Sequence, residues 1–491
     1  MTGMTVQERG LFIDGGWHGA DRGTVRTITD PATGETVGRT ACAGPADVDR
    51  AVAAARTAQP AWAATHADER AAVLHRAAAL IEDRADLIAE LLTREQGKPV
   101  PDSRKEILFG AQVLCYYAEE GRRVGGSLRA SVRADVKSVV GWAPIGVVGA
   151  IVPWNYPVDL YCWKIAPALA AGDAVVAKPP VETPLAVGLV VRCLHEAGVP
   201  AGVLADLPGD ADAGQRLVAH PDVAMITATA SSATGQAIMR GAADGLKRLS
   251  LELGGQCPFV VLDDADIAEA AAAAARRSFS NAGQICIAVN RVLVAEPVAD
   301  AFVAALAEIA DGIELGHGVD DGVAYGPVLN EAVRERSRDH VADAVQRGAR
   351  VVSGGAEPSG DAYARGTFFR PTVLDHTPRT ARAMTEETFG PVVAVHRLPG
   401  GTGLDAAAVT HANATPHGLA AYLYTGDLER GWALADRLET GAVGVNVNDV
   451  SELQAPFGGW KLSGFGRELG PEGLTAFLHQ RHVRMRVRPR P

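Results

Sequence analysis

The sequence predicts an α/β protein with two α/β domains, each built on a mostly parallel sheet, and one small β element. The chain has 491 residues, 47% of them hydrophobic, and this length exceeds what one hydrophobic core usually serves. Patterns typical of a strand, a turn and a helix repeat from Pro144 to Leu253 and start again after Leu253. Such alternation indicates crossover connections between parallel strands, with ligands bound at the carboxyl ends of the strands.

The N-terminal part of the chain precedes this alternation. Residues 10–45 are expected to form a short hairpin region, and the spacing of apolar residues predicts helices within 45–97 and at 103–120. Residues 129–140 look like an extended arm. The tail, 473–486, is also expected to be extended and is a candidate to pair with this arm.

The two α/β regions are expected to contain elements in the following order. Strands are predicted at 146–152, 173–178, 202–207, 223–227 and 247–253, with a helix ending at Ala171 and helices at 184–197, 211–219 and 232–240. After Leu253, strands are predicted at 256–262, 291–295, 349–352, 392–397 and 442–447, with helices at 265–279, 297–310, 330–347, 403–413 and 427–438.

Bulk properties exclude several classes of protein. The formal net charge of −11 argues against a nucleic-acid-binding surface, and the basic tail from Arg481 to Arg490 is expected to be a solvated strand. The six cysteines show neither a Cys-x-x-Cys pair nor metal-ligand spacing, which favours reduced thiols and no metal site. The N-terminus has no signal-peptide pattern, and the apolar run from Val139 to Trp154 is broken by glycine and proline. We therefore expect a cytoplasmic protein that does not enter a membrane.

One thiol has the surroundings of a nucleophile. Cys286 ends the stretch Asn281-Ala-Gly-Gln-Ile-Cys286, which lies between a helical run and a strand. A loop held at both ends can present a nucleophile to a cleft, although an isolated Cys is more often a small buried hydrophobe. The acidic motif Glu252-Leu-Gly-Gly255 lies just upstream.

The residues alone leave cofactor binding open. A Gly-x-Gly-x-x-Gly fingerprint would bring the backbone close to a pyrophosphate. Residues 208–214 and 229–235 each supply only part of it.

Many motifs, in order along nearly the whole chain, resemble those of the aldehyde dehydrogenase superfamily in its non-acylating, NAD(P)-dependent form. They include Pro153-Trp-Asn-Tyr-Pro157, Trp163 to Gly172, Lys178-Pro, Glu252-Leu-Gly-Gly255, Gly283-Gln-Ile-Cys286, Glu387-Thr-Phe-Gly-Pro391 and Pro456 to Arg467. The resemblance implies a dinucleotide-binding domain (1–124 and 143–251), a catalytic domain (252–452) and an oligomerisation arm with a C-terminal strand (125–142 and 453–491). It also implies a homodimer or homotetramer that acts on a small-molecule aldehyde.

The resemblance assigns three catalytic roles. Cys286 would add to the aldehyde to give a thiohemiacetal and, after hydride loss, a thioester. Asn155 and the backbone amide of Cys286 would donate to the developing oxyanion. Glu252 would act as the base for the water that hydrolyses the thioester.

The matching positions also imply a cofactor site and a substrate pocket. Cofactor contacts are expected from Trp154, Lys178, Pro180, Thr229, Ser231, Glu387 and Phe389. The pocket would be lined by Tyr156, Leu160, Trp163, Ile285, Ile287 and Phe457. Val181 stands where NAD-preferring members often carry a Glu, so NAD and NADP are both candidates, with NAD slightly preferred.

Departures from the family pattern keep other functions open. Ala228 and Ala230 replace larger or more flexible residues near the expected dinucleotide, which suggests a reshaped cofactor site, an impaired binding protein or a cofactor-independent thiol esterase. Cys257 is either a second thiol near the site or, more simply, a buried packing residue.

The pocket residues favour an apolar or aromatic aldehyde. Succinic-semialdehyde members commonly carry an Arg at the position of Trp163, and its absence argues against a short acidic substrate. Asp159 and Glu119 match positions near the family's entrance. Two carboxylates there would favour an aminoaldehyde as the second candidate, unless both are ordinary surface acids.

Overall fold

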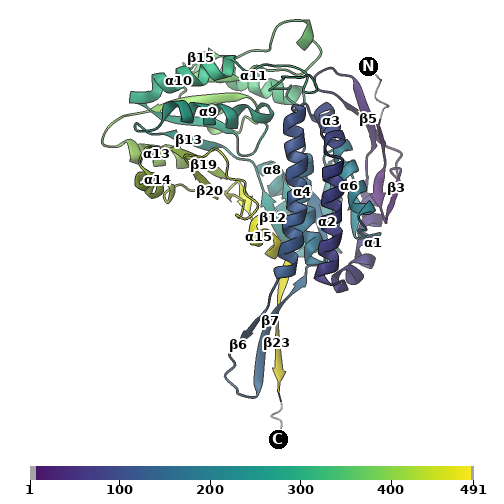
Figure 1. The fold of residues 1–491 in the computed structure, drawn as a ribbon. Coiled ribbons are helices and arrows are strands. Elements are labelled where there is room, and N and C mark those ends of the chain that lie inside the picture. The colour runs from purple at the N-terminus through teal and green to yellow at the C-terminus, as the bar shows by residue number, and fades with distance from the viewer. Residues whose placement is uncertain (1–6, 488–491) are drawn as a thin grey trace.

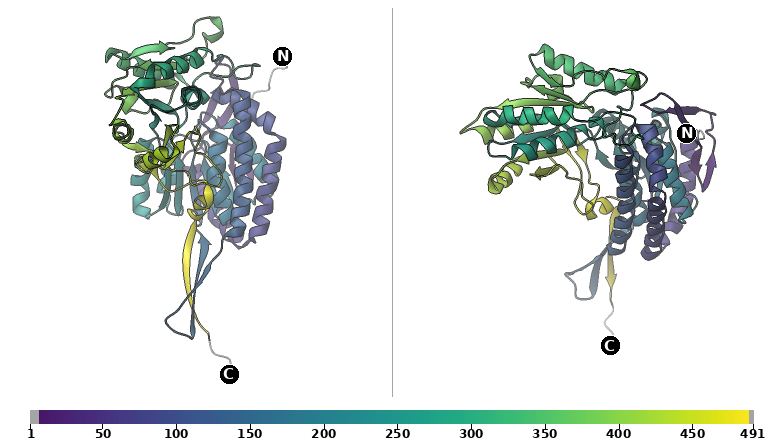
Figure 2. Two further views of the ribbon diagram at one scale, coloured as in Figure 1. Left: turned by 60° about the vertical axis from the view of Figure 1, so that its left-hand side comes forward. Right: turned by 45° about the horizontal axis from the view of Figure 1, so that its top comes forward.

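The computed structural model describes residues 7–487, which form two α/β bodies and a projecting three-stranded sheet (Figure 1). The projecting sheet extends away from both bodies in each view of Figures 1 and 2. Among the described residues, no helix is both long and apolar enough to cross a membrane.

The first body contains an eight-stranded sheet in the order β22-β12-β11-β8-β9-β10-β2-β3. Strands β12, β11, β8, β9 and β10 are mutually parallel. At one edge β22 is antiparallel to β12, and at the other β2 is antiparallel to β10 and β3 is antiparallel to β2. The bounds are β2 Leu11–Ile13, β3 Gly16–His18, β8 Val147–Ile151, β9 Ala174–Lys178, β10 Leu204–Asp206, β11 Met225–Thr229, β12 Arg248–Glu252 and β22 Gly464–Phe465. A small neighbouring sheet contains β1 Gln7–Arg9, β5 Thr36–Ala41 and β4 Val25–Thr29.

Helices cover both faces of this sheet. Helices α1, α7 and α8 pack on one face, and α5 and α6 pack on the other, with α2, α3 and α4 outside them (Figure 1). The bounds are α1 Pro45–Ala64, α2 Ala67–Asp83, α3 Ala85–Gln96, α4 Val100–Arg123, α5 Pro157–Ala171, α6 Leu185–Glu196, α7 Ala211–Ala219, α8 Ser232–Ala242 and the 3-10 turn η1 Ala243–Gly245.

The second body contains a seven-stranded sheet in the order β15-β16-β17-β14-β13-β19-β20. Only β15, at one edge, is antiparallel to its neighbour. Its strands are β13 Cys257–Val261, β14 Val289–Ala295, β15 Arg350–Ser353, β16 Thr372–Asp375, β17 Val392–Leu398, β19 Ala420–Tyr424 and β20 Ala442–Val445. Its helices are α9 Ile267–Phe279, η2 Ser280–Gly283, α10 Glu296–Asp311, α11 Glu331–Gln346, η3 Asp361–Tyr363, α12 Arg382–Thr385, α13 Leu404–Asn413 and α14 Leu428–Ala435.

The projecting sheet confirms the predicted pairing of the arm with the tail. Strand β7 (Val136–Pro144) lies between β6 (Ser127–Arg129) and β23 (Leu478–Arg486). Its antiparallel register with β23 runs from Leu478 opposite Pro144 to Arg486 opposite Val136. The last residues of the predicted basic strand, 488–490, lie outside the described residues.

The predicted strands and helices of both bodies are confirmed within a few residues. Helix α12, the 3-10 turns and strand β22 are short and were not predicted, and there are three further differences. Strands β16 and β19 were not predicted, because each is a short buried run that periodicity cannot separate from other apolar segments. The tail is not extended throughout: α15 (Gly470–Thr475) precedes β23. The short pair β18 (His417–Gly418) and β21 (Trp460–Lys461) was also not predicted.

Candidate active site

Cys286 lies on a loop with an unusual backbone. The loop follows α9 and begins with the turn η2, in which Asn281, Ala282 and Gly283 have positive φ angles of 48°, 53° and 73°. A left-handed conformation is costly for a residue such as Ala282 and persists only where the surroundings fix it. At Gly283 a side chain is also excluded, because a Cβ atom would overlap the carbonyl oxygen of Gly390.

Buried amides hold this loop. Asn281 accepts a hydrogen bond from Gln96 (2.9 Å) and donates to the backbone oxygen of Asn155 (3.0 Å). Gln284 donates to the Asn281 carbonyl (2.9 Å) and accepts from the amide of Leu329 (2.9 Å). These bonds connect the Cys286 loop to α3 and to the segment that follows β8.

Asn155 follows β8 and is buried beside the same loop. The side-chain amide of Asn155 donates to the backbone oxygen of Gln284 (3.1 Å). The backbone carbonyl of Asn155 accepts a hydrogen bond from Lys98 (2.7 Å). An amide nitrogen carries two N–H donors. One donor therefore remains for an oxygen atom in the cavity.

The Glu252-Leu-Gly-Gly255 motif brings Glu252 close to Cys286. Glu252 ends β12 and is buried. A side chain at Gly255 would overlap the Cys286 carbonyl oxygen, and one at Gly254 would overlap the Glu387 carboxylate. The two glycines thus allow three chain segments to meet at one point, and Gly255 also donates its N–H to Glu387 (3.0 Å).

Burial changes the ionisation of both reactive groups. Burial first, and the negative charge of Glu468 second, raise the pKa of Glu252 to about 8. Burial, followed by the Glu252 charge, raises the pKa of the Cys286 thiol well above its ordinary value. Within the described chain, no N–H or O–H group donates to either Glu252 oxygen. The carboxylate lies within hydrogen-bonding reach of the Cys286 thiol, so the proposed base stands next to the sulfur that would carry the acyl group.

A buried ion pair lies behind Glu252. Lys164 on α5 donates to Glu468 (2.5 Å) and to the Thr229 hydroxyl (2.7 Å), and Lys164 is fully buried. Lys164 lies within the motif from Trp163 to Gly172, but no role was predicted for it. Glu468 was not predicted because 304 residues separate it from Lys164.

A cavity of about 220 Å³ opens on one side of Cys286. Of the predicted cofactor residues, Trp154, Thr229, Ser231, Glu387 and Phe389 line it, together with Asn155, Glu252 and Cys286. Lys178 and Pro180 are not among its lining residues. Lys178 ends β9, which pairs with β8, and Pro180 follows it at the carboxyl edge of the sheet.

The walls of this cavity suit a charged, ring-containing ligand. Ser231 caps the N-terminus of α8, where backbone N–H groups can receive an anion. The rings of Trp154 and Phe389 meet edge to face, with centroids 5.3 Å apart. Burial raises the pKa of Glu387 to about 7. Arg336, which was not predicted, also lines the cavity, and its Nε atom donates to the Thr388 carbonyl (2.7 Å).

A second cavity, of about 330 Å³, opens on the other side of Cys286 and Asn155. All the predicted substrate residues line it, namely Tyr156, Leu160, Trp163, Ile285, Ile287 and Phe457. The sequence did not reveal its polar lining, which comes from Asp102, Lys105, Glu106, Arg276, Arg277, Ser280, Asp449 and Ser451. The two cavities share Cys286 and Asn155, so a ligand in either one can reach the thiol.

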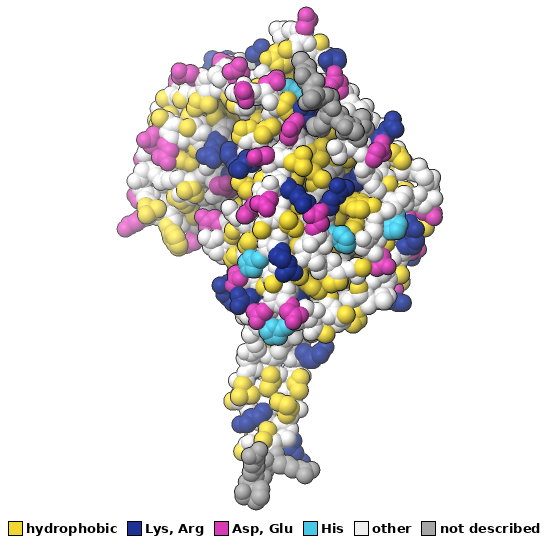
Figure 3. Space-filling model, turned by 45° about the vertical axis from the view of Figure 1, so that its right-hand side comes forward, with side chains coloured by type: hydrophobic (Ala, Val, Ile, Leu, Met, Phe, Trp, Pro, Cys, Tyr) yellow, Lys and Arg dark blue, Asp and Glu magenta, His cyan; other side chains and the backbone are white. Residues whose placement is uncertain are grey.

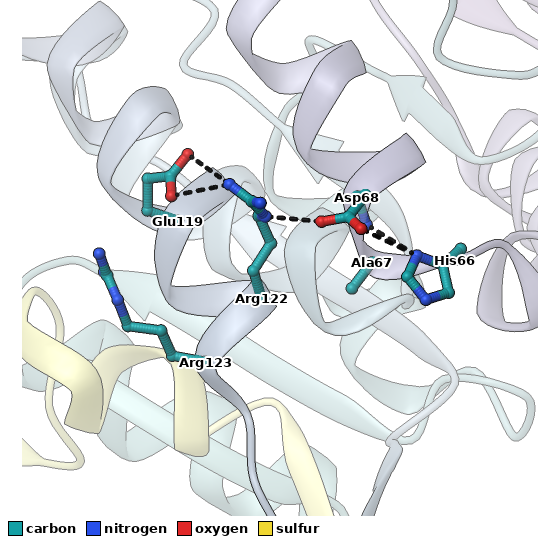
Figure 4. Close-up of a pocket in the computed structure, with 6 residues that line it drawn as sticks. All are labelled: His66, Ala67, Asp68, Glu119, Arg122 and Arg123. Carbon is teal, nitrogen blue, oxygen red and sulfur yellow. Dashed lines mark hydrogen bonds and ion pairs between the residues drawn. The ribbon is translucent and has the colours of Figure 1, made fainter.

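The expected pair of entrance carboxylates is only half correct. Asp159 lines the second cavity, but Glu119 lies near the C-terminal end of α4, in a surface hollow with His66, Asp68 and Arg122 (Figure 4). There it pairs with Arg122 (3.1 Å) and with His75 (2.8 Å). Glu119 is therefore a surface acid with local partners.

The departures from the family pattern fall in different places. Ala228 is fully buried within β11 and belongs to the hydrophobic core. Ala230 lines the first cavity and donates its N–H to the Glu252 carbonyl (3.0 Å). Cys257 is a buried packing residue that lines neither cavity, although its thiol lies 3.6 Å from the Cys286 carbonyl oxygen.

The chain is similar to known enzymes over almost its whole length. The model of the aldehyde dehydrogenase family matches residues 17–483. The succinate-semialdehyde dehydrogenase [NADP(+)] of Escherichia coli is 39% identical over 98% of this chain and 99% of its own. The glutarate-semialdehyde dehydrogenase of Pseudomonas putida is 38% identical over 96% of each chain.

Solved structures agree with this. The betaine aldehyde dehydrogenase of Staphylococcus aureus in complex with NAD+ has a TM-score of 0.95 and 33% identity, and the match covers 98% of this chain and 95% of that one. The sheets, the cavities and the sequence thus lead to one conclusion. The chain belongs to the aldehyde dehydrogenase family and is an oxidoreductase that acts on the aldehyde group.

Proposed function

We propose that the protein oxidises a small aldehyde to the carboxylic acid with NAD or NADP, through a thioester on Cys286. The observation that carries this proposal is the meeting of two cavities at Cys286 and Asn155. One cavity has walls that suit a dinucleotide, and the other has the apolar walls of a small-molecule site. A thiol between them can hold the substrate within reach of a hydride acceptor.

Cys286 and Asn155 carry the first half of the reaction. The Cys286 thiolate adds to the aldehyde carbon and forms a thiohemiacetal. The Asn155 amide and the Cys286 backbone N–H donate to the oxyanion, and one such donor typically contributes about 100- to 1,000-fold in rate. Loss of hydride from the same carbon then leaves a thioester.

Glu252 carries the second half. Water attacks the thioester carbonyl, Glu252 accepts a proton from that water, and the acid leaves as the Cys286 thiolate forms again. The place of Glu252 beside the Cys286 thiol and its pKa of about 8 suit this role near neutral pH. The charge of Glu468 raises the pKa of Glu252, and the charge of Lys164 lowers it.

The walls of the first cavity support a nicotinamide dinucleotide as the cofactor. A bound nicotinamide dinucleotide supplies the hydride acceptor. The N-terminus of α8 with Ser231 would receive the pyrophosphate, Glu387 would accept hydrogen bonds from ribose hydroxyls, and Trp154 and Phe389 would flank the ring. Val181 is buried and apolar, so no carboxylate at that position would repel the 2′-phosphate of NADP.

The second cavity favours an aldehyde with an apolar or aromatic body. Phe109, Tyr156, Trp163 and Phe457 provide ring surfaces, and Phe457 meets Trp163 edge to face at 5.2 Å. The relatives named above carry names for acidic semialdehydes. Position 163 here holds an aromatic ring instead of a cation that would neutralise such a carboxylate.

The projecting sheet would join two copies of the chain. Strands β6 and β23 form its open edges, and exposed apolar side chains lie along it, including Leu128 (68%), Val132 (100%) and Met485 (47%). Figure 3 shows hydrophobic side chains gathered on the visible face of this arm. Unpaired strand edges with apolar side chains favour pairing with another strand, which supports a homodimer or homotetramer.

An activity assay tests this function and its alternatives. The purified protein is mixed with NAD or NADP and a panel of aldehydes, and reduced nicotinamide is followed by absorbance. Oxidation should depend on Cys286, whereas Cys115→Ala, at a half-buried thiol on α4 outside both cavities, should be active. Ester cleavage without nicotinamide reduction would support a thiol esterase instead. No reaction at all would support an impaired binding protein.

A further inference from the structure

Asp159 differs from the other acids of the substrate cavity. Glu106 pairs with Lys98 (2.5 Å), Asp102 with Lys105 (2.9 Å), and Asp449 with Arg277 (3.0 Å). Within residues 7–487, no cationic side chain forms an ion pair with Asp159. It is thus the acid of this cavity that lacks a countercharge.

The fold fixes one oxygen of Asp159 and leaves the other to the cavity. Asp159 and Trp163 lie one turn apart on α5, and the Trp163 indole N–H donates to Asp159 Oδ1 (2.7 Å). No donor in the described part of the chain contacts Oδ2. Because Oδ2 is neither hydrogen-bonded nor fully buried, it is open to the cavity that Asp159 lines.

Aromatic rings surround this carboxyl. Trp163 packs against Phe109 (centroids 6.4 Å apart) and against Phe457 (5.2 Å), and all three rings line the cavity with Asp159. The ring faces of Trp, Tyr and Phe attract cations, most strongly where water is excluded. A carboxyl among such rings is a combination that binds a protonated amine.

We propose that Asp159 binds a protonated amine at the far end of the substrate, so that the preferred substrate is a cationic aminoaldehyde. This rests on the proposed aldehyde oxidation and adds a second contact to it. The apolar body of such a substrate would pack on the cavity wall, with its aldehyde at Cys286 and its N–H donor at Asp159. An aldehyde that ends in a carboxylate would meet Asp159 with the same charge and would be disfavoured.

The charges around Asp159 define what a bound cation would change. Burial, and then the charge of Glu106, raise the pKa of Asp159 well above its ordinary value, and Lys98 opposes this shift. A bound ammonium would supply the missing countercharge and favour the ionised carboxylate. Arg276 also lines the cavity and forms no ion pair within residues 7–487, but its side chain is exposed, so solvent screens its charge.

Three substrates of similar size test the proposal. They are 4-(dimethylamino)butanal, which is protonated at neutral pH, its uncharged isostere 5-methylhexanal, and the anionic 5-oxopentanoate. The parental enzyme should have the highest kcat/KM for the cation and the lowest for the anion. Asp159→Asn keeps an acceptor for Trp163 but removes the charge, so it should lower kcat/KM for the cation by about 10- to 100-fold. For the uncharged isostere the change should stay within about twofold.

Glu119→Gln is the matched control, because it removes one carboxylate from the surface hollow outside the cavity. It should leave the order of the three substrates unchanged. An equal loss for all three substrates in Asp159→Asn would assign Asp159 a structural role in α5 and overturn the proposal. A parental preference for 5-oxopentanoate would overturn it too. If no aldehyde is oxidised with either nucleotide, the proposed function itself fails; oxidation of 5-methylhexanal without a preference for the cation refutes only the role of Asp159.

Discussion

The α-carbon of Gly255 lies directly against the carbonyl oxygen of Cys286, so closely that a Cβ atom at position 255 would overlap that oxygen. The loop that follows Glu252 and the loop that carries the thiol are therefore fitted to each other through one glycine. This contact fixes the distance between the proposed nucleophile and the proposed base.

Gly255→Ala should separate the two loops and disrupt catalysis. Because the overlap is with backbone, the Cys286 loop must move, and overpacking of this kind typically costs about 1–3 kcal/mol of stability. Displacement of a reacting group by about 1 Å can lower the rate by about 100-fold. The melting temperature and kcat/KM check both effects. Gly19→Ala, at a glycine with open space around it, is the control and should change neither.

Thioester hydrolysis should become faster as the pH rises through about 8, the pKa to which burial raises Glu252. The sign follows from the role: water is activated by the ionised carboxylate, and this form is lost as the pH falls below the pKa. Single-turnover hydrolysis of the acyl-enzyme between pH 6 and pH 10 measures it. A rate that is flat over this range would show that Glu252 is not the titrating base.

Glu468→Gln should move this pH profile to lower pH. The negative charge of Glu468 raises the pKa of Glu252, whereas Lys164 lowers it. Removal of the carboxylate therefore leaves Glu252 next to an unpaired cation, and the ionised form persists at lower pH. Glu472→Gln, at an exposed acid of α15, is the control and should keep the parental midpoint. A midpoint in Glu468→Gln at or above the parental value would contradict this coupling.

Replacement of exposed apolar residues on β23 should dissociate the oligomer. We expect the parental protein to sediment as a dimer or tetramer, because the edges of the projecting sheet are open. Val483→Lys with Met485→Lys places charges on a strand where both side chains are more than 40% exposed, at 43% and 47%. The variant should sediment as a smaller species with unchanged far-UV circular dichroism. A parental protein that is monomeric at micromolar concentration would refute the role given to the arm.

The sequence was sufficient to predict most strands and helices of both bodies, although not β16, β19 or β22, and the resemblance named most residues of the two cavities beside Cys286. These predictions succeeded because local signals carry them: turn glycines, helix periodicity and ordered motifs. The partnership of Lys164 with Glu468 could not be predicted, since it joins residues far apart in the chain. The same holds for Arg336, which reaches the first cavity from α11.

Glu119 illustrates why a position along a helix misleads without the fold. Glu106 on α4 lines the substrate cavity, whereas Glu119 lies about 20 Å further along the same helix axis at 1.5 Å per residue. The resemblance placed Glu119 near the entrance, but the length of the helix takes it away from the cavity that Glu106 lines. The domain boundaries drawn from the resemblance remain a prediction.

The central claim is that Cys286 carries the acyl group and Glu252 releases it. Glu252→Gln removes the base but also removes the charge that raises the pKa of Cys286, so acylation should be spared. Rapid mixing of this variant with aldehyde and nucleotide should give one burst of reduced nicotinamide per active site and almost no further turnover. Mass spectrometry should then find the acyl group on Cys286. Turnover of Glu252→Gln at the parental rate, or an acyl group on another residue, would contradict the account.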